Sequence, residues 1–248
     1  MKGIMIQGCS SDAGKSFIAT AICRVLSNKG YLVCPFKSQN MSNNSYVTAD
    51  GGEIGRAQGE QARAARQEPT VFMNPILLKP QKTTGAEIIL FGQVYDSMNG
   101  REYQQKFTMN KGLQAVDQAL EHIRENFELI VIEGAGSPAE INLNDREIVN
   151  MRIANRADVP VLLVVDVNRG GSFASVVGTL ELVGEDRQRI KGIIFNNFRG
   201  DVSLFADGAQ WIEDYTGIKV VGIMPHLDDV ILAGEDSLSI NFRSSFKE

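Results

Sequence analysis

The residues with the clearest chemical potential stand in a short loop near the start of the chain. Residues 3–16 read GIMIQGCSSDAGKS, an apolar run that breaks into a glycine-bounded loop. In such a loop, backbone N–H groups and the N-terminus of the following helix point at the same anion. Lys15 would reach the β- and γ-phosphates of a nucleotide, and the Ser16 hydroxyl would ligate magnesium. The predicted nucleotide-binding residues are Gly8, Ser11, Asp12, Ala13, Gly14, Lys15, Ser16 and Phe17.

The loop departs in one respect from the common phosphate-loop pattern. That pattern has glycine five places before Gly14, whereas this chain has Cys9 there and its glycine at Gly8. The loop is therefore one residue longer than the common form. The alternative interpretation is an ordinary helix start with an incidental lysine.

Two charged residues follow predicted strands and could complete the site. Lys37 comes after the apolar stretch at 31–36, and Glu133 ends the continuous apolar run at 129–132. Ligands of open α/β sheets collect at the carboxyl ends of the strands. Lys37 is thus a candidate second cation for phosphate or an anionic substrate, and Glu133 a candidate magnesium ligand, since hard cations prefer oxygen. The alternatives are a solvated lysine and a strand terminator.

A long polar segment lies between these two strands, at 38–56. It is rich in Asn and Gly and shows no periodicity before residue 53, where we expect a helix over 53–66. Polar loops of this length inside a compact domain are disordered or functional. Asp50 and Glu53 are candidate metal or substrate groups; the alternative makes Asp50 a turn residue and Glu53 a helix-capping aid.

The expected elements alternate strand and helix along the chain, which predicts a three-layer, doubly wound α/β fold with a mostly parallel sheet. The short apolar runs at 74–80 and 87–91 would add an antiparallel extension. Helices are expected at 102–125, 145–156 and 202–215, and strands at 161–165, 192–195 and 219–223. Polar residues fall just after these later strands: Asp166, Asn168, Arg169, Asn196, Arg199 and His226.

Composition limits the class of protein. The chain has 248 residues, a net charge of −5, 43% hydrophobic residues and 22% charged residues, which is ordinary for a soluble globular protein. The sequence has no basic cluster of the kind that indicates nucleic-acid binding. No apolar stretch approaches the ~18 residues of a membrane span. Cys9, Cys23 and Cys34 lack metal-binding or disulfide spacing, which favours a reduced cytoplasm. We expect one domain over 1–236 and a polar tail over 237–248.

A series of motifs in fixed order resembles the ATP-binding amidoligase domain of the cobyric acid synthase family. The motifs are GCSSDAGKS, PFKSQNMSNNSYVTADGGEIGRAQ, MNPILLKP, EGAGSPAEINL, VNRGGSFAS and NNFRGD, and the likeness continues to EDSL at 235–238. The phosphate loop alone is similar to a wider group that includes dethiobiotin synthetase and the MinD/ParA ATPases. The MinD/ParA branch is disfavoured, because those proteins carry a lysine where this chain has Ser10.

The resemblance implies a ligase that uses ATP and Mg²⁺ to amidate peripheral carboxylates of a corrinoid, adenosylcobyrinic acid a,c-diamide, through an acyl phosphate. Ammonia would come from glutamine by way of a glutaminase domain or partner chain, and a homodimer is possible. It implies catalytic roles for Lys15, Lys37 and Glu133, metal ligands at Ser16, Asp50 and Glu133, and adenine recognition by Asn196. Substrate contacts would come from Gln39, Asn40, Asn44, Ser45, Glu53, Arg56 and Arg169.

The chain departs from the family pattern at Glu147, Arg152, Asn168 and Asn197, where aspartate, glycine, aspartate and lysine are usual. None of its cysteines stands in a nucleophile context, and its only histidines are His122 and His226, so no glutaminase can be assembled from these residues. Two alternatives stay open: a dethiobiotin-synthetase-like ligase for a small substrate, and a non-catalytic or specialised nucleotide-binding paralogue.

Overall fold

A computed structural model describes residues 2–81 and 85–227 of the chain. Its centre is a six-stranded sheet in which every neighbouring pair is parallel, with the order β12-β11-β10-β1-β9-β2. The strands are β1 (Lys2–Gly8), β2 (Val33–Phe36), β9 (Leu129–Glu133), β10 (Val161–Asp166), β11 (Ile190–Phe198) and β12 (Val220–Pro225). The predicted parallel sheet is confirmed, and β2, which contains Pro35, is an edge strand as Pro35 suggests.

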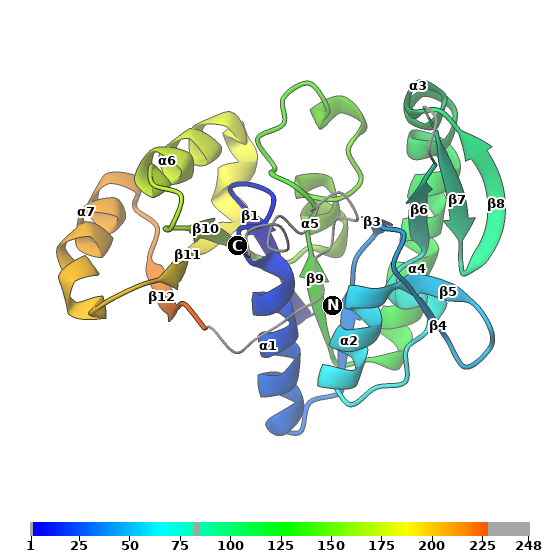
Figure 1. Cartoon of the computed structure of the whole chain (residues 1–248), viewed down its shortest axis with the longest axis horizontal. Coiled ribbons are helices and arrows are strands. Elements are labelled where there is room, and N and C mark those ends of the chain that lie inside the picture. The colour runs from blue at the N-terminus through cyan, green and yellow to red at the C-terminus, as the bar shows by residue number, and fades with distance from the viewer. Residues whose placement is uncertain (1, 82–84, 228–248) are drawn as a thin grey trace, which may run out of the picture.

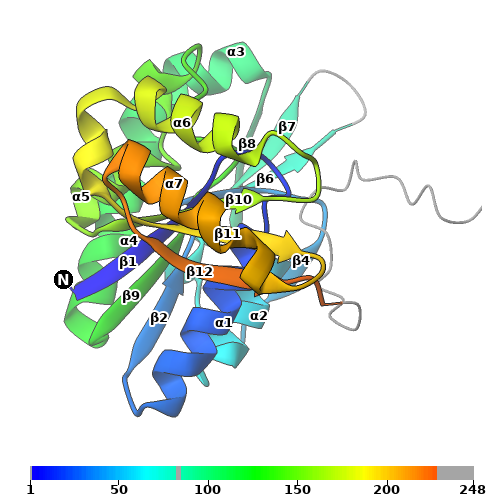
Figure 2. The same ribbon diagram turned by 90° about the vertical axis from the view of Figure 1, so that its left-hand side faces the viewer.

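Helices cover both faces of this sheet, which confirms the three-layer prediction (Figure 2). Helices α1 (Lys15–Asn28) and α2 (Arg56–Ala64) cover one face, where Ile18 and Cys23 pack on Ile6 and Val131. The larger core on the other face lies under α4 (Leu113–Asn126), α5 (Met151–Ala157), α6 (Ser172–Leu182) and α7 (Ala206–Thr216). Neighbouring residues of β1, Met5 and Ile6, enter opposite cores, as strand alternation requires.

A second, smaller sheet stands beside the first, to the right in Figure 1. Its order is β3-β6-β7-β8, formed by β3 (Gln39–Met41), β6 (Ile76–Pro80), β7 (Ala86–Leu90) and β8 (Gln93–Met98). β6 and β7 are antiparallel, as predicted, whereas β3 pairs with β6 in parallel. Strands β4 (Ser45–Val47) and β5 (Glu53–Gly55) form a separate hairpin. The prediction of an irregular segment before residue 53 is therefore wrong.

Several predicted helices begin later than expected or change type. α2 begins at Arg56 rather than at Glu53, which belongs to β5. The helix expected at 102–125 runs through α3 (Gly100–Glu102), the π-helical η2 (Tyr103–Gly112) and α4. The region expected as one helix at 145–156 has the short η3 (Asn144–Arg146) and then α5.

The remaining short helices are η1 (Val71–Met73), η4 (Gly184–Arg189) and η5 (Val202–Phe205). Among the described residues, none of the helices combines the length and apolarity needed to cross a bilayer. The predicted polar tail at 237–248 lies outside the described residues.

Candidate functional site

The phosphate loop joins the carboxyl end of β1 to the start of α1. Gly14 has φ +99°, and a Cβ there would lie 2.0 Å from the Asn196 amide nitrogen, so only glycine fits this turn without displacement of Asn196. The Asn196 amide in turn donates to the Ala13 carbonyl at 2.9 Å. Asp12 also has a positive φ, of 56°. The loop is thus held in a tightly turned form against the end of β11.

Lys15 lies inside this loop and is only 4% exposed. Its ammonium donates to the Ser10 carbonyl at 3.1 Å and to the Gly136 carbonyl at 3.0 Å. The lysine therefore joins the phosphate loop to the segment that follows β9. Both contacts are to neutral carbonyls, which a phosphate group could replace with a stronger, charge-assisted hydrogen bond.

Glu133, at the end of β9, is the buried acid of the site and is 0% exposed. Ser16 Oγ donates to its Oε1 at 2.8 Å and Lys37 Nζ to the same oxygen at 3.0 Å, while Gln61 Nε2 donates to Oε2. Burial by itself raises the pKa of a carboxyl, but the Lys37 charge and these hydrogen bonds bring the pKa of Glu133 below its ordinary value. Glu133 is therefore an ionised carboxylate within a ring of donors.

The donor set fits Mg²⁺. The Ser16 hydroxyl and the Glu133 carboxylate present hard oxygen atoms and are in direct contact, and Mg²⁺ is usually held by one or two such groups together with water and substrate phosphate. Over residues 2–81 and 85–227, no group of three or more His, Cys, Asp or Glu side chains could hold a metal alone. A magnesium ion held by these two groups would need further oxygen ligands, such as those of water or a nucleotide phosphate.

The structure does not bring Asp50 to this cluster. Asp50 is exposed in the turn of the β4–β5 hairpin, where its carboxylate accepts a hydrogen bond from Thr48. Asp50 thus lies in a turn, as the alternative interpretation of this residue describes. Glu53 forms an ion pair with Lys79 and belongs to β5, so it is not a helix-capping residue.

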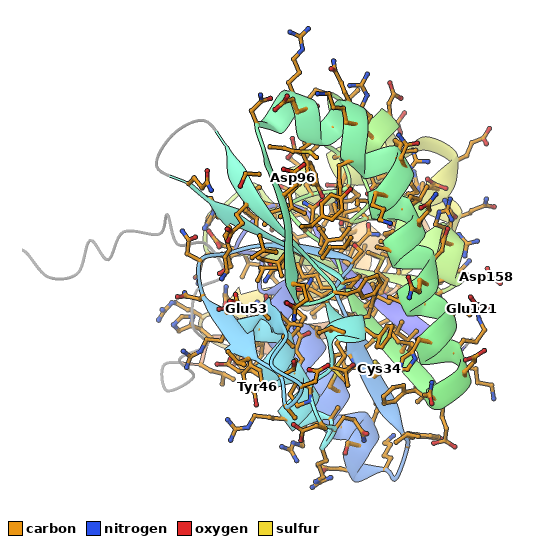
Figure 3. All side chains as sticks on the ribbon, turned by 90° about the vertical axis from the view of Figure 1, so that its right-hand side faces the viewer. Cys34, Tyr46, Glu53, Asp96, Glu121 and Asp158 are labelled. Atoms are coloured by element: carbon orange, nitrogen blue, oxygen red, sulfur yellow. The ribbon has the colours of Figure 1, made fainter. Side chains whose placement is uncertain are left out.

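The other predicted substrate residues separate into different environments. Asn40 is 3% exposed, and its amide donates to Gln58 at 3.2 Å. Asn44 contributes its backbone to a turn, Ser45 begins β4, and Arg56 pairs with Glu60 at 3.2 Å. Figure 3 shows Glu53 and Tyr46 on this hairpin; Tyr46 packs closely on Gly59 of α2. Gln39 lines two cavities, which are described below.

Asn196 and Arg169 lie beside the phosphate loop. Asn196 lines a cavity of about 230 Å³ together with Gly14, Phe17, Asn197, Pro225, His226 and Leu227. Its position beyond the loop, next to the start of α1, suits a nucleotide base. Arg169 is exposed and pairs with Asp12 at 3.3 Å, which places a cation over the loop. The roles of both residues stay predictions.

Gln58 and Gln61 are parts of the site that the sequence reasoning missed. Both are fully buried on α2, although they lie in a polar, alanine-rich stretch. Gln61 contacts Glu133, and Gln58 accepts from Asn40, while Gln61 Oε1 and Gln58 Nε2 lack hydrogen-bond partners. A Cβ at Gly55 would collide with both Asn40 and Gln58. The signal available in the sequence is the spacing of three residues, which places two glutamines on one helix face.

Comparison with protein families gives a match over residues 4–240 to the CobQ/CobB/MinD/ParA nucleotide binding domain. The chain is 53% identical over 243 residues to a cobyric acid synthase of Geobacillus sp. (strain WCH70), with 98% of this chain and 48% of that protein covered. It is 52% identical over 248 residues to a cobyric acid synthase of Nostoc sp., with 100% of this chain and 50% of that protein covered. The chain thus spans about half the length of the curated relatives it matches.

Solved structures support the fold alone. The signal recognition particle 54 kDa protein from Aeropyrum pernix, in complex with GDP, matches with a TM-score of 0.53 and 14% identity, over 91% of this chain and 42% of that chain. The receptor FtsY from Elizabethkingia anophelis matches with a TM-score of 0.51 and 12% identity, over 94% of this chain and 63% of that chain. The sheet and helices described above are therefore shared with proteins of very different sequence.

Proposed function

Because the chain belongs to the CobQ/CobB/MinD/ParA nucleotide-binding domain family, with cobyric acid synthases among its relatives, we propose that it is an ATP-dependent amidoligase unit for a corrinoid. Its reaction would convert peripheral carboxylates of adenosylcobyrinic acid a,c-diamide to carboxamides. The observation that carries this proposal is the contact of Ser16 and Lys37 with the buried Glu133 carboxylate beside the phosphate loop.

A carboxylate is a poor acyl donor, so the reaction needs activation. In the proposed step, a substrate carboxylate oxygen attacks the γ-phosphorus of ATP, and the bond to the leaving ADP breaks. Ammonia then attacks the acyl carbon, the C–O bond to phosphate breaks, and the ammonia loses a proton. Each step moves negative charge among phosphoryl oxygens, where positioned cations lower the barrier.

The described residues divide this work among them. When ATP binds, the Lys15 ammonium would exchange its hydrogen bonds to the Ser10 and Gly136 carbonyls for contacts with the β- and γ-phosphates. Ser16 and Glu133 would hold Mg²⁺, which supplies charge neutralisation at the phosphates. Lys37, 2% exposed, forms an ion pair with Glu133 at the same edge and helps to lower the pKa of that carboxyl. The proposed ligase requires that these residues bind ATP and transfer its γ-phosphoryl group to a substrate, which a nucleotide-dependent switch does not do.

Ammonia must come from elsewhere than this chain's thiols. Burial raises the pKa of Cys9 to about 11 and that of Cys23 to about 12, and Cys34 is fully buried. Thiols protonated at neutral pH are poor nucleophiles for glutamine hydrolysis. We propose that a glutaminase domain or chain delivers the ammonia, that free ammonium can replace it, and that the protein works in the cytoplasm.

The test measures phosphate release from ATP and Mg²⁺ with ammonium chloride, with and without the corrinoid, while mass spectrometry follows the product. We expect corrinoid-dependent phosphate release and conversion of carboxylate to carboxamide with ammonium, and none with glutamine alone. Lys15→Ala should abolish ATP binding, whereas Lys29→Ala, at the exposed end of α1, should not change it. ATP binding without corrinoid-stimulated turnover would contradict the ligase and favour a specialised nucleotide-binding paralogue.

A further inference from the structure

An apolar cavity of about 380 Å³ lies on the small sheet, away from the nucleotide contacts. Its walls come from β3, β6, β7, the start of η2 and the segment before α5. The apolar lining side chains are Met41, Leu78, Ile88, Met98, Leu143, Ile148 and Val149. Tyr103 also lines this cavity, and its hydroxyl donates to Gln39 at 2.6 Å, so its polar end is satisfied. An apolar cavity with a few oriented polar groups is the usual form of a small-molecule site.

A second cavity, of about 240 Å³, adjoins the first and extends toward the segment after β9 that contacts Lys15. The two share Gln39, Met41, Leu143, Glu147 and Val149 as lining residues. The second cavity extends to Ala135, Gly136 and Ser137. Since the Gly136 carbonyl accepts the hydrogen bond from Lys15, one end of this path lies at the phosphate-binding lysine. We call the two adjoining cavities the trough.

The edge of the trough is unusually apolar for an exposed surface. Met41 is 50% exposed and Leu143 is 40% exposed, although both line the two cavities. Arg146, also exposed, adds a cation to the lining of the larger cavity. Apolar side chains exposed together at a cavity are typical of a ligand-binding groove. A cation at the same place favours a ligand with further carboxylates.

We propose that the trough seats the apolar ring of a large polycarboxylate substrate, with one ring edge on Met41, Leu78 and Ile88. The carboxylate to be activated would then extend through the smaller cavity to Gly136 and Lys15. Another carboxylate of the same ligand would meet Arg146. The inference rests on the proposed function, because it places the carboxylate substrate of that reaction, and it assigns a specificity role to residues outside the nucleotide site.

The test is equilibrium binding of adenosylcobyrinic acid a,c-diamide, followed by its visible absorbance, in the presence of Mg²⁺ and a non-hydrolysable ATP analogue. Leu143→Asp and Met41→Asp place a charge on the trough at exposed positions, where folding tolerates it. Each should raise the corrinoid Kd by about 10- to 100-fold, the value of one buried apolar side chain. Binding of the ATP analogue should stay within about twofold, since neither residue contacts the phosphate loop.

Val94→Asp is the matched control. Val94 is 67% exposed on β8 of the same sheet and does not line the trough, so its substitution should leave the corrinoid Kd unchanged. An unchanged Kd in both trough variants, or an equal loss in Val94→Asp, would overturn the trough while leaving the proposed reaction intact. A wild-type protein that binds the ATP analogue but no corrinoid would overturn the proposed reaction and the trough together.

Discussion

At Glu133 a carboxylate is completely buried, and its ionised form depends on the groups around it. Ser16, Lys37 and Gln61 all donate to it. Removing one member of a buried ion pair leaves the other charge without compensation, and costs more than the pair contributes. The contact between Lys37 and Glu133 therefore affects stability as well as the proposed chemistry.

Lys37→Met should lower the free energy of unfolding at pH 7 by about 3–5 kcal/mol, because Glu133 would remain buried without its cation. In the wild type the pKa of Glu133 lies below its ordinary value of 4.5, so its contribution is present above that pH and is lost as the pH falls through the folded-state pKa. In Lys37→Met, burial without the cation should raise the pKa of Glu133. The stability of this variant should therefore increase, rather than decrease, as the pH falls toward 4.5.

Urea unfolding at pH 7 and at pH 4.5 measures this difference. The gap between wild type and Lys37→Met should shrink at the lower pH, because protonation relieves the unpaired Glu133. Lys29→Met, which removes an exposed lysine at the end of α1, should follow the wild type at both pH values. A gap that is the same at pH 7 and 4.5 would show that Glu133 does not carry the effect.

At the residue scale, the sequence was enough to predict the meeting of Lys15, Ser16, Lys37 and Glu133. Lys15 and Ser16 come after β1, Lys37 follows β2 and Glu133 ends β9, and the carboxyl ends of parallel strands share one edge of the sheet. Their chemical roles stay predictions. The sequence did not predict that Gln61 contacts Glu133, because the polarity of a helix does not by itself reveal which of its faces is buried. Asp50 was predicted as a metal ligand from its residue type; the structure places it in an exposed hairpin turn, and its metal role stays a prediction.

Among the elements, the segment before α5 is fixed by one side chain. The Glu147 carboxylate accepts hydrogen bonds from the backbone N–H groups of Val149, Asn150 and Arg152, at 2.7, 2.6 and 2.8 Å. The Arg152 guanidinium donates back to the carbonyls of Glu147 at 2.9 Å and Asp145 at 3.1 Å. Glu147 and Arg152, both departures from the family pattern, thus contact the same short segment and stabilise one wall of the trough.

Glu147→Ala should therefore weaken corrinoid binding more than nucleotide binding. Loss of the three acceptor contacts should lower the free energy of unfolding by about 0.5–2 kcal/mol, the range for a helix N-terminal cap. Calorimetric titration with the corrinoid and with the ATP analogue, together with thermal unfolding, measures each effect. Asp145→Ala is the control, since it removes an exposed carboxylate but keeps the backbone carbonyl used by Arg152. An equal loss of both affinities would contradict the local role of Glu147.

The long apolar strands were predictable at the element scale, whereas the short strands were not. β9 is a continuous apolar run, as expected of a parallel strand buried on both faces. β3, β4 and β5 have three residues each, which is too short for an alternating apolar pattern to be recognised. Their extended conformation depends on pairing with neighbouring strands, as in the parallel pairing of β3 with β6.

For the molecule as a whole, the proposed site lies where two sheets meet. Figure 1 shows the small sheet beside the parallel sheet. The parallel sheet supplies the phosphate loop and Glu133, and the small sheet supplies many lining residues of the trough. Sequence patterns predicted both sheets, but the parallel pairing of β3 with β6 is a long-range contact that local patterns do not encode. That pairing carries the chain from Lys37 into the small sheet and places Gln39 in the trough.

The most direct test of the central claim follows one oxygen atom. The corrinoid is labelled with ¹⁸O in its free carboxylates and incubated with ATP, Mg²⁺ and ammonium, and the released phosphate is analysed by mass spectrometry. Attack of the carboxylate on the γ-phosphorus, followed by ammonia at the acyl carbon, transfers one carboxylate oxygen to phosphate. We predict one ¹⁸O in phosphate for each carboxamide formed. Unlabelled phosphate alongside amidated corrinoid would contradict the acyl-phosphate route.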